Sequence, residues 1–342
     1  MRAFPALLAV FLWVAPMAAW AETTIILAHS NKNDAADNPT AAMAVTFKDL
    51  VERKSGGALK VQIFPEGQLG ADDQAVSLVK KGIIQMAISS ISGISKLYPL
   101  IAALDFPFAY DEVSEAYAVL DGPFGQFVRG DIEAKTGLAV LGFGDTGGLF
   151  VLTNSKRPIR QPSDMTGLRI RTMAFPSHKA LITSLGAEPV TIPWNYVLDA
   201  LLTGLADGQI NPISTTRYGR LHTVQKYMTL TNHAYVPFLW TANRQFLAGL
   251  SEEERRIIAE GVTEGVRASR SLAISVTGDR LAALLPSVQI HTPTEAELSA
   301  FRHVTQPAAR TFVAETLGDE GTRFLDSVLT AVDKARRERL GQ

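Results

Sequence analysis

The middle of the sequence reads DMTGLRIR at Asp164–Arg171, then LGAEPV at Leu185–Val190 and ADGQINP at Ala206–Pro212. Short β-prone runs in these segments are separated by helical patterns at Ser177–Leu185 and Asn195–Thr203. Strands that alternate with helices along a chain are typical of a mainly parallel sheet with helices on its faces. This part of the chain is therefore expected to form an α/β unit.

The first half of the chain carries a second pattern of the same kind. Extended runs at Thr23–Ala28, Leu59–Phe64 and Met86–Ser89 alternate with helical patterns at Ala41–Lys54 and Asp72–Lys81. The apolar residues of the first helical pattern fall on one face, as they do in a helix that covers a sheet. A second α/β unit follows from this alternation.

The two units are joined by more than one segment. Strands are expected at Leu138–Phe143 and Leu149–Thr153, between the units. The longest helical pattern opens at Ser251, with Glu254 completing a capping box, and extends to about Leu285. These features predict a bilobal α/β protein whose cleft closes by hinge motion and binds its ligand at the carboxyl ends of the strands.

Residues 1–21 have the order of a secretory signal peptide. Arg2 is their only charge, Phe4–Val14 is apolar, and Ala19–Ala21 (AWA) supplies the Ala-x-Ala cleavage site. The apolar stretch is shorter than the roughly 20 residues that a membrane anchor needs, and no cysteine is present to carry a lipid. We expect a mature protein that begins near Glu22 and diffuses freely in the periplasm.

The composition argues against several classes of protein. A charged fraction of 20% and a hydrophobic fraction of 46% are those of an ordinary globular protein. The formal net charge of −1, with no basic run, argues against a nucleic-acid partner. Because the chain has no cysteine, disulfides and thiolate metal sites are excluded.

Motifs that would indicate an enzyme lack their required context. Gly142–Gly147 (GFGDTG) matches the dinucleotide-binding pattern, but residues 148–152 read as a strand, whereas that motif must open a helix. A bend between strands or lobes explains these glycines better. Ser77–Lys80 matches S-x-x-K without its companion motifs, and the six histidines form no close metal-ligand cluster. We expect a non-enzymatic protein with no cofactor and no metal.

Five segments, taken together, resemble one family. Phe64–Gly70 (FPEGQLG) is similar to a "P-x-x-Q-L-G" turn and Leu104–Phe108 (LDFPF) to an "L-P-F" segment. The three central segments quoted first are similar to "D-x-x-G-x-K-x-R", "G-A-x-P" and "D-G-x-E-N-P". In this order, and over nearly the whole mature chain, they resemble the solute-binding proteins of tripartite ATP-independent periplasmic (TRAP) transporters, the DctP family.

The resemblance implies two lobes with mixed sheets, crossing hinge strands and a long helix that spans both. Lobe I is expected to comprise residues 22–148 and about 237–276, and lobe II residues 149–236 and about 277–342. It also implies that the cleft captures a small organic acid and delivers it to membrane permease subunits driven by an ion gradient. A sensor that presents a carboxylate to a membrane histidine kinase has the same fold and remains the alternative.

Family positions carry over to individual residues. Arg171 matches the arginine that pairs with the solute carboxylate, a role suited to the guanidinium fork, although spacing alone also fits a surface charge or an ion pair within one lobe. Asn211 matches an amide that reaches the solute, and Trp194 an aromatic residue against its body. A turn residue and a core tryptophan are the alternatives for these two. Weaker matches add Ser30, Ser90, Tyr235 and Asp72, the last of which helix capping also explains.

The departures from the family pattern concern charge. Phe150 stands where many members carry another arginine, and Ile210 where a glutamate precedes the asparagine. Tyr196 and Leu198 replace a further glutamate and tyrosine. The cleft is therefore expected to be more apolar, with Phe150 in its lining, and to favour a monocarboxylate with an apolar or hydroxylated body over a C4-dicarboxylate.

Overall fold

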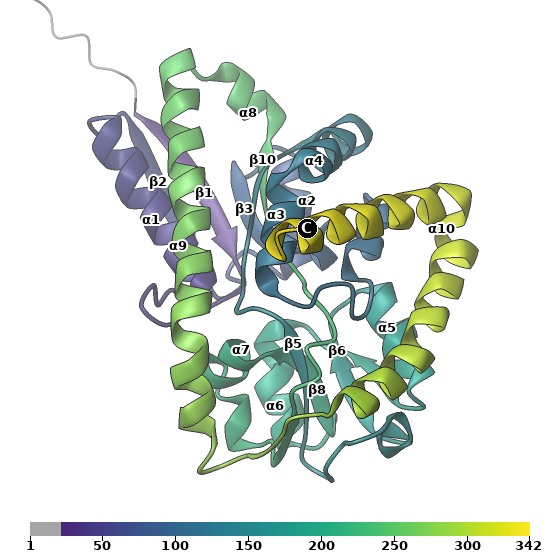
Figure 1. The fold of residues 1–342 in the computed structure, drawn as a ribbon. Coiled ribbons are helices and arrows are strands. Elements are labelled where there is room, and N and C mark those ends of the chain that lie inside the picture. Colours follow the sequence, from purple (N-terminus) through teal and green to yellow (C-terminus); the bar gives the residue numbers. More distant parts are fainter. Residues whose placement is uncertain (1–21) are drawn as a thin grey trace, which may run out of the picture.

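The computed structural model describes residues 22–342 and has two lobes, each built on one β-sheet (Figure 1). The expected signal peptide at residues 1–21 lies outside the described residues. The two-lobed α/β fold with mixed sheets that the sequence predicted is confirmed. Within residues 22–342, no helix combines the length and the apolar character needed to cross a membrane.

The first lobe contains a five-stranded sheet in the order β2-β1-β3-β10-β4. Strand β1 pairs in parallel with β2 and β3, and β10 returns from late in the chain to pair antiparallel with β3 and β4. The strands are β1 (Thr23–His29), β2 (Leu59–Phe64), β3 (Met86–Ser90), β4 (Leu138–Gly144) and β10 (Phe238–Asn243). The helices are α1 (Pro39–Lys54), α2 (Asp72–Lys80), α3 (Val113–Asp121), α4 (Pro123–Thr136) and α8 (Arg244–Gly249).

The second lobe contains a six-stranded sheet in the order β11-β9-β5-β8-β6-β7. Strand β6 is parallel to β7 and β8, whereas β5 is antiparallel to β8 and β9. The strands are β5 (Phe150–Asn154), β6 (Arg169–Thr172), β7 (Glu188–Thr191), β8 (Gly208–Pro212), β9 (Tyr227–Thr229) and β11 (Gln289–His291). The helices are α5 (Pro176–Ser184), α6 (Val197–Leu202) and α7 (Ile213–Tyr218).

The chain passes from the first lobe to the second between β4 and β5. Asp145 fixes this passage, because its Oδ1 accepts the backbone N–H groups of Gly147 and Gly148 at 2.7 and 2.8 Å. Gly147 has φ of 144°, which glycine adopts without steric cost. Phe150, two residues after Gly148, begins a strand and not a helix. The G-x-G-x-x-G pattern is thus a bend between the lobes.

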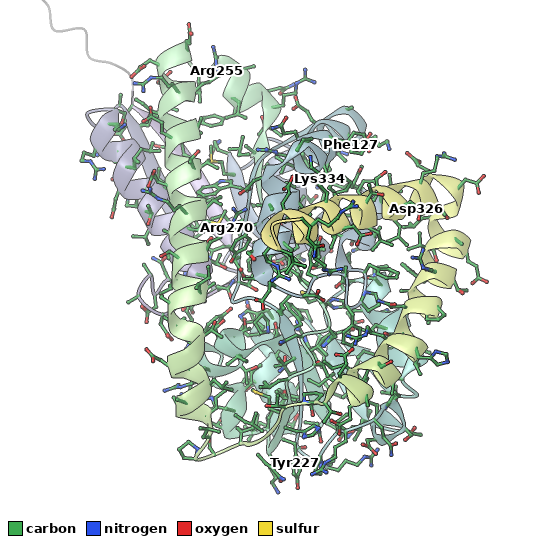
Figure 2. All side chains as sticks on the ribbon, in the orientation of Figure 1. Phe127, Tyr227, Arg255, Arg270, Asp326 and Lys334 are labelled. Atoms are coloured by element: carbon green, nitrogen blue, oxygen red, sulfur yellow. The ribbon has the colours of Figure 1, made fainter. Side chains whose placement is uncertain are left out.

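Helix α9 (Glu252–Leu284) spans both lobes, as the figure shows (Figure 1). In the first lobe, Arg270, labelled on this helix in Figure 2, pairs with Asp121 at 2.5 and 2.9 Å. At its far end, Leu284 belongs to the same hydrophobic cluster as Val151 of the second lobe. Residues near the end of α9 therefore pack with the second lobe.

Helix α10 (Glu295–Arg339) divides between the lobes in a way the sequence did not predict. Its first half packs on α5, and after Gly318, where φ is 63°, the chain changes direction (Figure 1). Phe324 of the second half then packs against Tyr98, with ring centroids 6.2 Å apart. The sequence assigned all of 277–342 to lobe II. The part after Gly318 contacts lobe I instead, because an amphipathic pattern shows which face of a helix is buried but not against which lobe.

Candidate ligand-binding site

A cavity of about 450 Å³ lies between the two lobes. The first lobe contributes the residues after β1 and β3 and the start of α2, and the second contributes the ends of β6 and β8, residues 191–196 and α7. This is the carboxyl end of the strands, where open α/β sheets bind ligands. Seven of the eight side chains expected in the cleft line this cavity: Ser30, Asp72, Ser90, Phe150, Arg171, Trp194 and Asn211.

Arg171 of β6 is the only lysine or arginine among the described residues that line the cavity. It is 2% exposed, and its Nε donates to the carbonyl oxygen of Ile192 at 2.9 Å. Burial lowers the pKa of the guanidinium to about 10, and the Asp72 carboxylate opposes that shift. Arg171 thus stays charged at neutral pH, and its two Nη groups are the donors left to bind a carboxylate.

Asp72, the first residue of α2, brings a carboxylate to the cavity from the first lobe. Its Oδ1 accepts the Ser30 hydroxyl at 2.6 Å, and its Oδ2 accepts the hydroxyl and the backbone N–H of Ser90 at 2.6 and 3.0 Å. Burial raises the pKa of Asp72, and these hydrogen bonds and the charge of Arg171 act in the opposite direction. The carboxylate is bonded to strand ends and does not cap its own helix, whose N-cap is Ala71.

The remaining walls combine amides and aromatic rings. Asn211 is 6% exposed, and its Nδ2 donates to the Oε1 of Gln209 at 2.5 Å, so its own amide oxygen is left as an acceptor. Trp194 and Tyr218 meet edge to face with ring centroids 6.1 Å apart. Phe150, which is 2% exposed, adds an apolar surface at the position where many family members carry another arginine. Such a mixture suits a ligand with an anionic end and a less polar body.

The family model for bacterial extracellular solute-binding proteins, family 7 (DctP), matches residues 30–316. The chain belongs to this family. The 2,3-diketo-L-gulonate-binding periplasmic protein YiaO of Escherichia coli (strain K12) is 34% identical over 229 residues, which cover 67% of this chain and 69% of that protein. The resemblance that the sequence suggested is therefore confirmed. The family consists of solute-binding proteins of transporters, which are not enzymes, as the sequence also predicted.

Two solved structures of such proteins overlay most of the chain. The sugar acid binding protein DctPAm of Advenella mimigardefordensis, in complex with galactonate, has a TM-score of 0.85 at 28% identity, covering 92% of this chain and 99% of that one. A TRAP periplasmic solute-binding protein of Sulfurospirillum deleyianum, with bound succinate, has a TM-score of 0.82 at 27% identity, covering 90% and 99%. Family members with this fold thus hold acids with one carboxylate and with two.

Tyr235 is the expected site residue of this DctP-family chain that the structure does not bring to the cavity. It is 1% exposed and packs against Tyr110 and Tyr117, with ring centroids 5.9 and 6.1 Å away. Its neighbour Val236 lines the cavity instead. Adjacent residues of an extended chain point in opposite directions, so an error of one position exchanges a cavity residue for a buried one.

Several cavity residues were missed by the sequence analysis, among them Asn31, Asn195, Thr215 and Tyr218. Thr215 and Tyr218 had a detectable signal, because they are three positions apart and so share one face of helix α7, which begins just after Asn211. Asn195 and Asn31 had none, since their place depends on how the two lobes meet. Among residues 22–342, no three His, Asp or Glu side chains gather as metal ligands.

Proposed function

We propose that this chain is the periplasmic solute-binding subunit of a TRAP transporter, and that it captures a small monocarboxylate between its lobes. Closure of the cleft buries the acid, and the loaded protein delivers it to membrane permease subunits driven by an ion gradient. Family membership supports the transporter class. The charge of the cavity supports the preference for one carboxylate.

The observation that carries the preference is a count of charges in the cavity lining. Among the described residues, Arg171 is the one cation there, while Asp72 and Asp73 are both carboxylic acids. Asp73 is paired with Lys96 at 2.8 Å, but Asp72 is bonded only to serines. A second solute carboxylate would therefore be buried without a cationic partner, and burying an unpaired charge is very costly.

The cavity also has room for more than a carboxylate. Its volume of about 450 Å³ lies within the range of about 300–1,000 Å³ that ligand pockets occupy. Asn31, Asn211 and Thr215 can bond hydroxyl groups, while Trp194 and Tyr218 offer apolar faces. These features support a hydroxylated acid such as the galactonate held by the Advenella protein.

A thermal-shift screen of the protein that begins at Glu22 tests the proposal. D-galactonate, D-erythronate, pantoate and lactate are compared with succinate, malate and fumarate at equal concentrations. A solute that binds only the folded state raises its melting temperature by mass action, so the monocarboxylates should give the larger shifts. Larger shifts with the three dicarboxylates would refute the preference, and no shift with any acid would argue against the solute class.

Location and delivery need separate measurements. Mass spectrometry of periplasmic extract should find a chain that begins near Glu22, and a retained residue 1–21 segment on membranes would contradict the proposed location. Uptake of the radiolabelled acid by cells should require both this protein and the permease subunits. Uptake that persists without the permease would remove the proposed partner.

A further inference from the structure

Three of the side-chain contacts that cross between the lobes involve the loops of the first lobe that follow β1 and β2. The Asn195 amide donates from Nδ2 to the carbonyl oxygen of Glu66 at 2.8 Å. The Tyr218 hydroxyl lies 3.4 Å from the Oδ1 of Asn31. The third is an ion pair between Arg280 Nη2 and Asp37 Oδ1 at 2.6 Å. The donors belong to the second lobe and the acceptors to loops of the first.

The backbone of the first lobe is shaped to receive Asn195. Glu66 and Gly67 both have positive φ, 55° and 67°, in the turn after β2. A side chain at position 67 would place a Cβ 2.5 Å from the Asn195 Nδ2, so any other residue would displace the Asn195 amide and also strain the turn, because its φ is positive. The N–H groups of Glu66 and Gly67 bond in turn to the carbonyl oxygens of Asn31 and His29 at 2.9 and 3.1 Å. The receiving turn is therefore fixed to the loop that follows β1.

The ion pair with Asp37 is made by Arg280, a residue of helix α9. Arg280 lies one turn before Leu284, in the part of α9 that packs in the second lobe. The Arg280 side chain is 7% exposed, and that of its partner Asp37 is 52% exposed. The guanidinium carbon also lies 5.9 Å from the centroid of the Tyr218 ring, which lines the cavity. The ion pair thus joins a buried cation of lobe II to the loop before α1.

We propose that Asn195 and Arg280 are positioning residues that hold the two lobes closed through bonds made entirely within the protein. Because these bonds need no solute, they stabilise the closed form of the free protein relative to the open form. The apparent affinity for a solute then depends on the fraction of molecules already closed. That consequence rests on the proposed function, whereas the closure itself does not.

Removing one contact should shift the closed-to-open ratio by about 2- to 10-fold, the range that follows from one hydrogen bond. Asn195→Ala removes the amide donor. Asp37→Ala removes the carboxylate that pairs with Arg280 and leaves the bond from Arg280 to the carbonyl oxygen of residue 37. Both side chains are on exposed residues, so neither change endangers the fold. Gln126→Ala and Asp49→Ala are matched controls, since these exposed residues of lobe I make no side-chain contact with lobe II among the described residues.

The measurement is the distance between two spin labels in the free protein, by double electron–electron resonance. The sequence has no cysteine, so Lys80→Cys in lobe I and Leu202→Cys in lobe II are labelled selectively. We expect a closed population that falls in Asn195→Ala and Asp37→Ala but not in the controls. Raising NaCl from about 0.05 to about 0.5 M should lower the closed population of the wild type and of Asn195→Ala, because salt screens the partly exposed ion pair. It should have no such effect in Asp37→Ala, which lacks that pair.

Two results would overturn this inference. One is a free wild-type protein with no closed population, and the other is a closed population in both variants equal to that of the controls. Circular dichroism confirms that each variant is folded. Because no solute is added, failure to find a binding acid leaves this result unaffected.

Discussion

The Nε of Arg171 donates to the carbonyl oxygen of Ile192 at 2.9 Å, so the one cation that the described residues bring to the cavity lining is held by its own lobe. This bond fixes the plane of the guanidinium and leaves its two Nη groups as a pair. A carboxylate that binds this pair makes two parallel hydrogen bonds. The geometry therefore concentrates anion recognition in a single residue.

Arg171→Ala should abolish most of the affinity for the acid that gives the largest thermal shift. Truncating one partner of a buried charged pair costs on the order of 2–5 kcal/mol, which is roughly a 30- to 5,000-fold loss of affinity. Arg171→Lys should recover part of it, because a point charge lacks the fork. Isothermal titration of the three proteins measures this, and near-normal binding by the alanine variant would remove Arg171 from the site.

The free protein should tolerate the loss of this cation. Burial lowers the pKa of Arg171 to about 10, which means that the fold disfavours its charge. Arg171→Met removes the charge at similar length, and its melting temperature without solute should equal or exceed that of the wild type. A large decrease would instead show that Arg171 serves the fold as a structural ion-pair residue.

Asp72→Asn should admit dicarboxylates. Like charges a few ångströms apart repel by a few kcal/mol at the effective dielectric of protein sites, so succinate affinity should rise roughly 10-fold or more. Asp73→Asn is the matched control, since Asp73 is already paired with Lys96 at 2.8 Å. Titration with succinate compares the two variants. An equal gain in both, or none in Asp72→Asn, would contradict the role given to this carboxylate.

The same residue predicts how binding depends on pH. Burial raises the pKa of Asp72 in the folded protein, and a solute carboxylate at Arg171 should raise it further, because both groups are negative. Binding then takes up a proton at Asp72. The affinity therefore increases as pH falls through the pKa of Asp72 in the complex, while the solute carboxylate stays ionised. Titrations of galactonate from about pH 8 to about pH 5 measure the slope, which should disappear in Asp72→Asn.

Local patterns predicted the fold and seven of the residues that line the cavity. The alternation of strands and helices fixed two α/β units, and the Ser251 capping box correctly placed the start of α9. Arg171 and Asn211 fell at strand ends, where a ligand site is expected. Those patterns carry no information on how distant parts meet. Asn195 and Glu66 are 129 positions apart, and the packing of Phe324 on lobe I likewise depends on the assembled lobes.

Tyr218→Phe and Tyr235→Phe form a pair that tests the boundary of the site, because each removes one hydroxyl. Tyr218 lines the cavity, and its hydroxyl lies 3.4 Å from Asn31 of the other lobe. Tyr235 is buried behind the cavity, and its hydroxyl has only a 3.5 Å contact with the carbonyl oxygen of Gly144. Because Tyr218 lines the cavity, its hydroxyl can bond the solute directly, and removing it should weaken galactonate binding by about 2- to 10-fold, the range for one hydrogen bond.

Removing the Tyr235 hydroxyl should leave affinity unchanged and lower the free energy of unfolding by no more than about 1 kcal/mol, since a contact of 3.5 Å lies beyond the usual range for an O–H donor. Calorimetry and denaturant unfolding of both variants supply the two readouts. Weaker binding by Tyr235→Phe, with normal stability, would return Tyr235 to the site as the sequence first placed it. Equal binding by both variants would instead show that the Tyr218 hydroxyl neither contacts the solute nor helps to close the lobes.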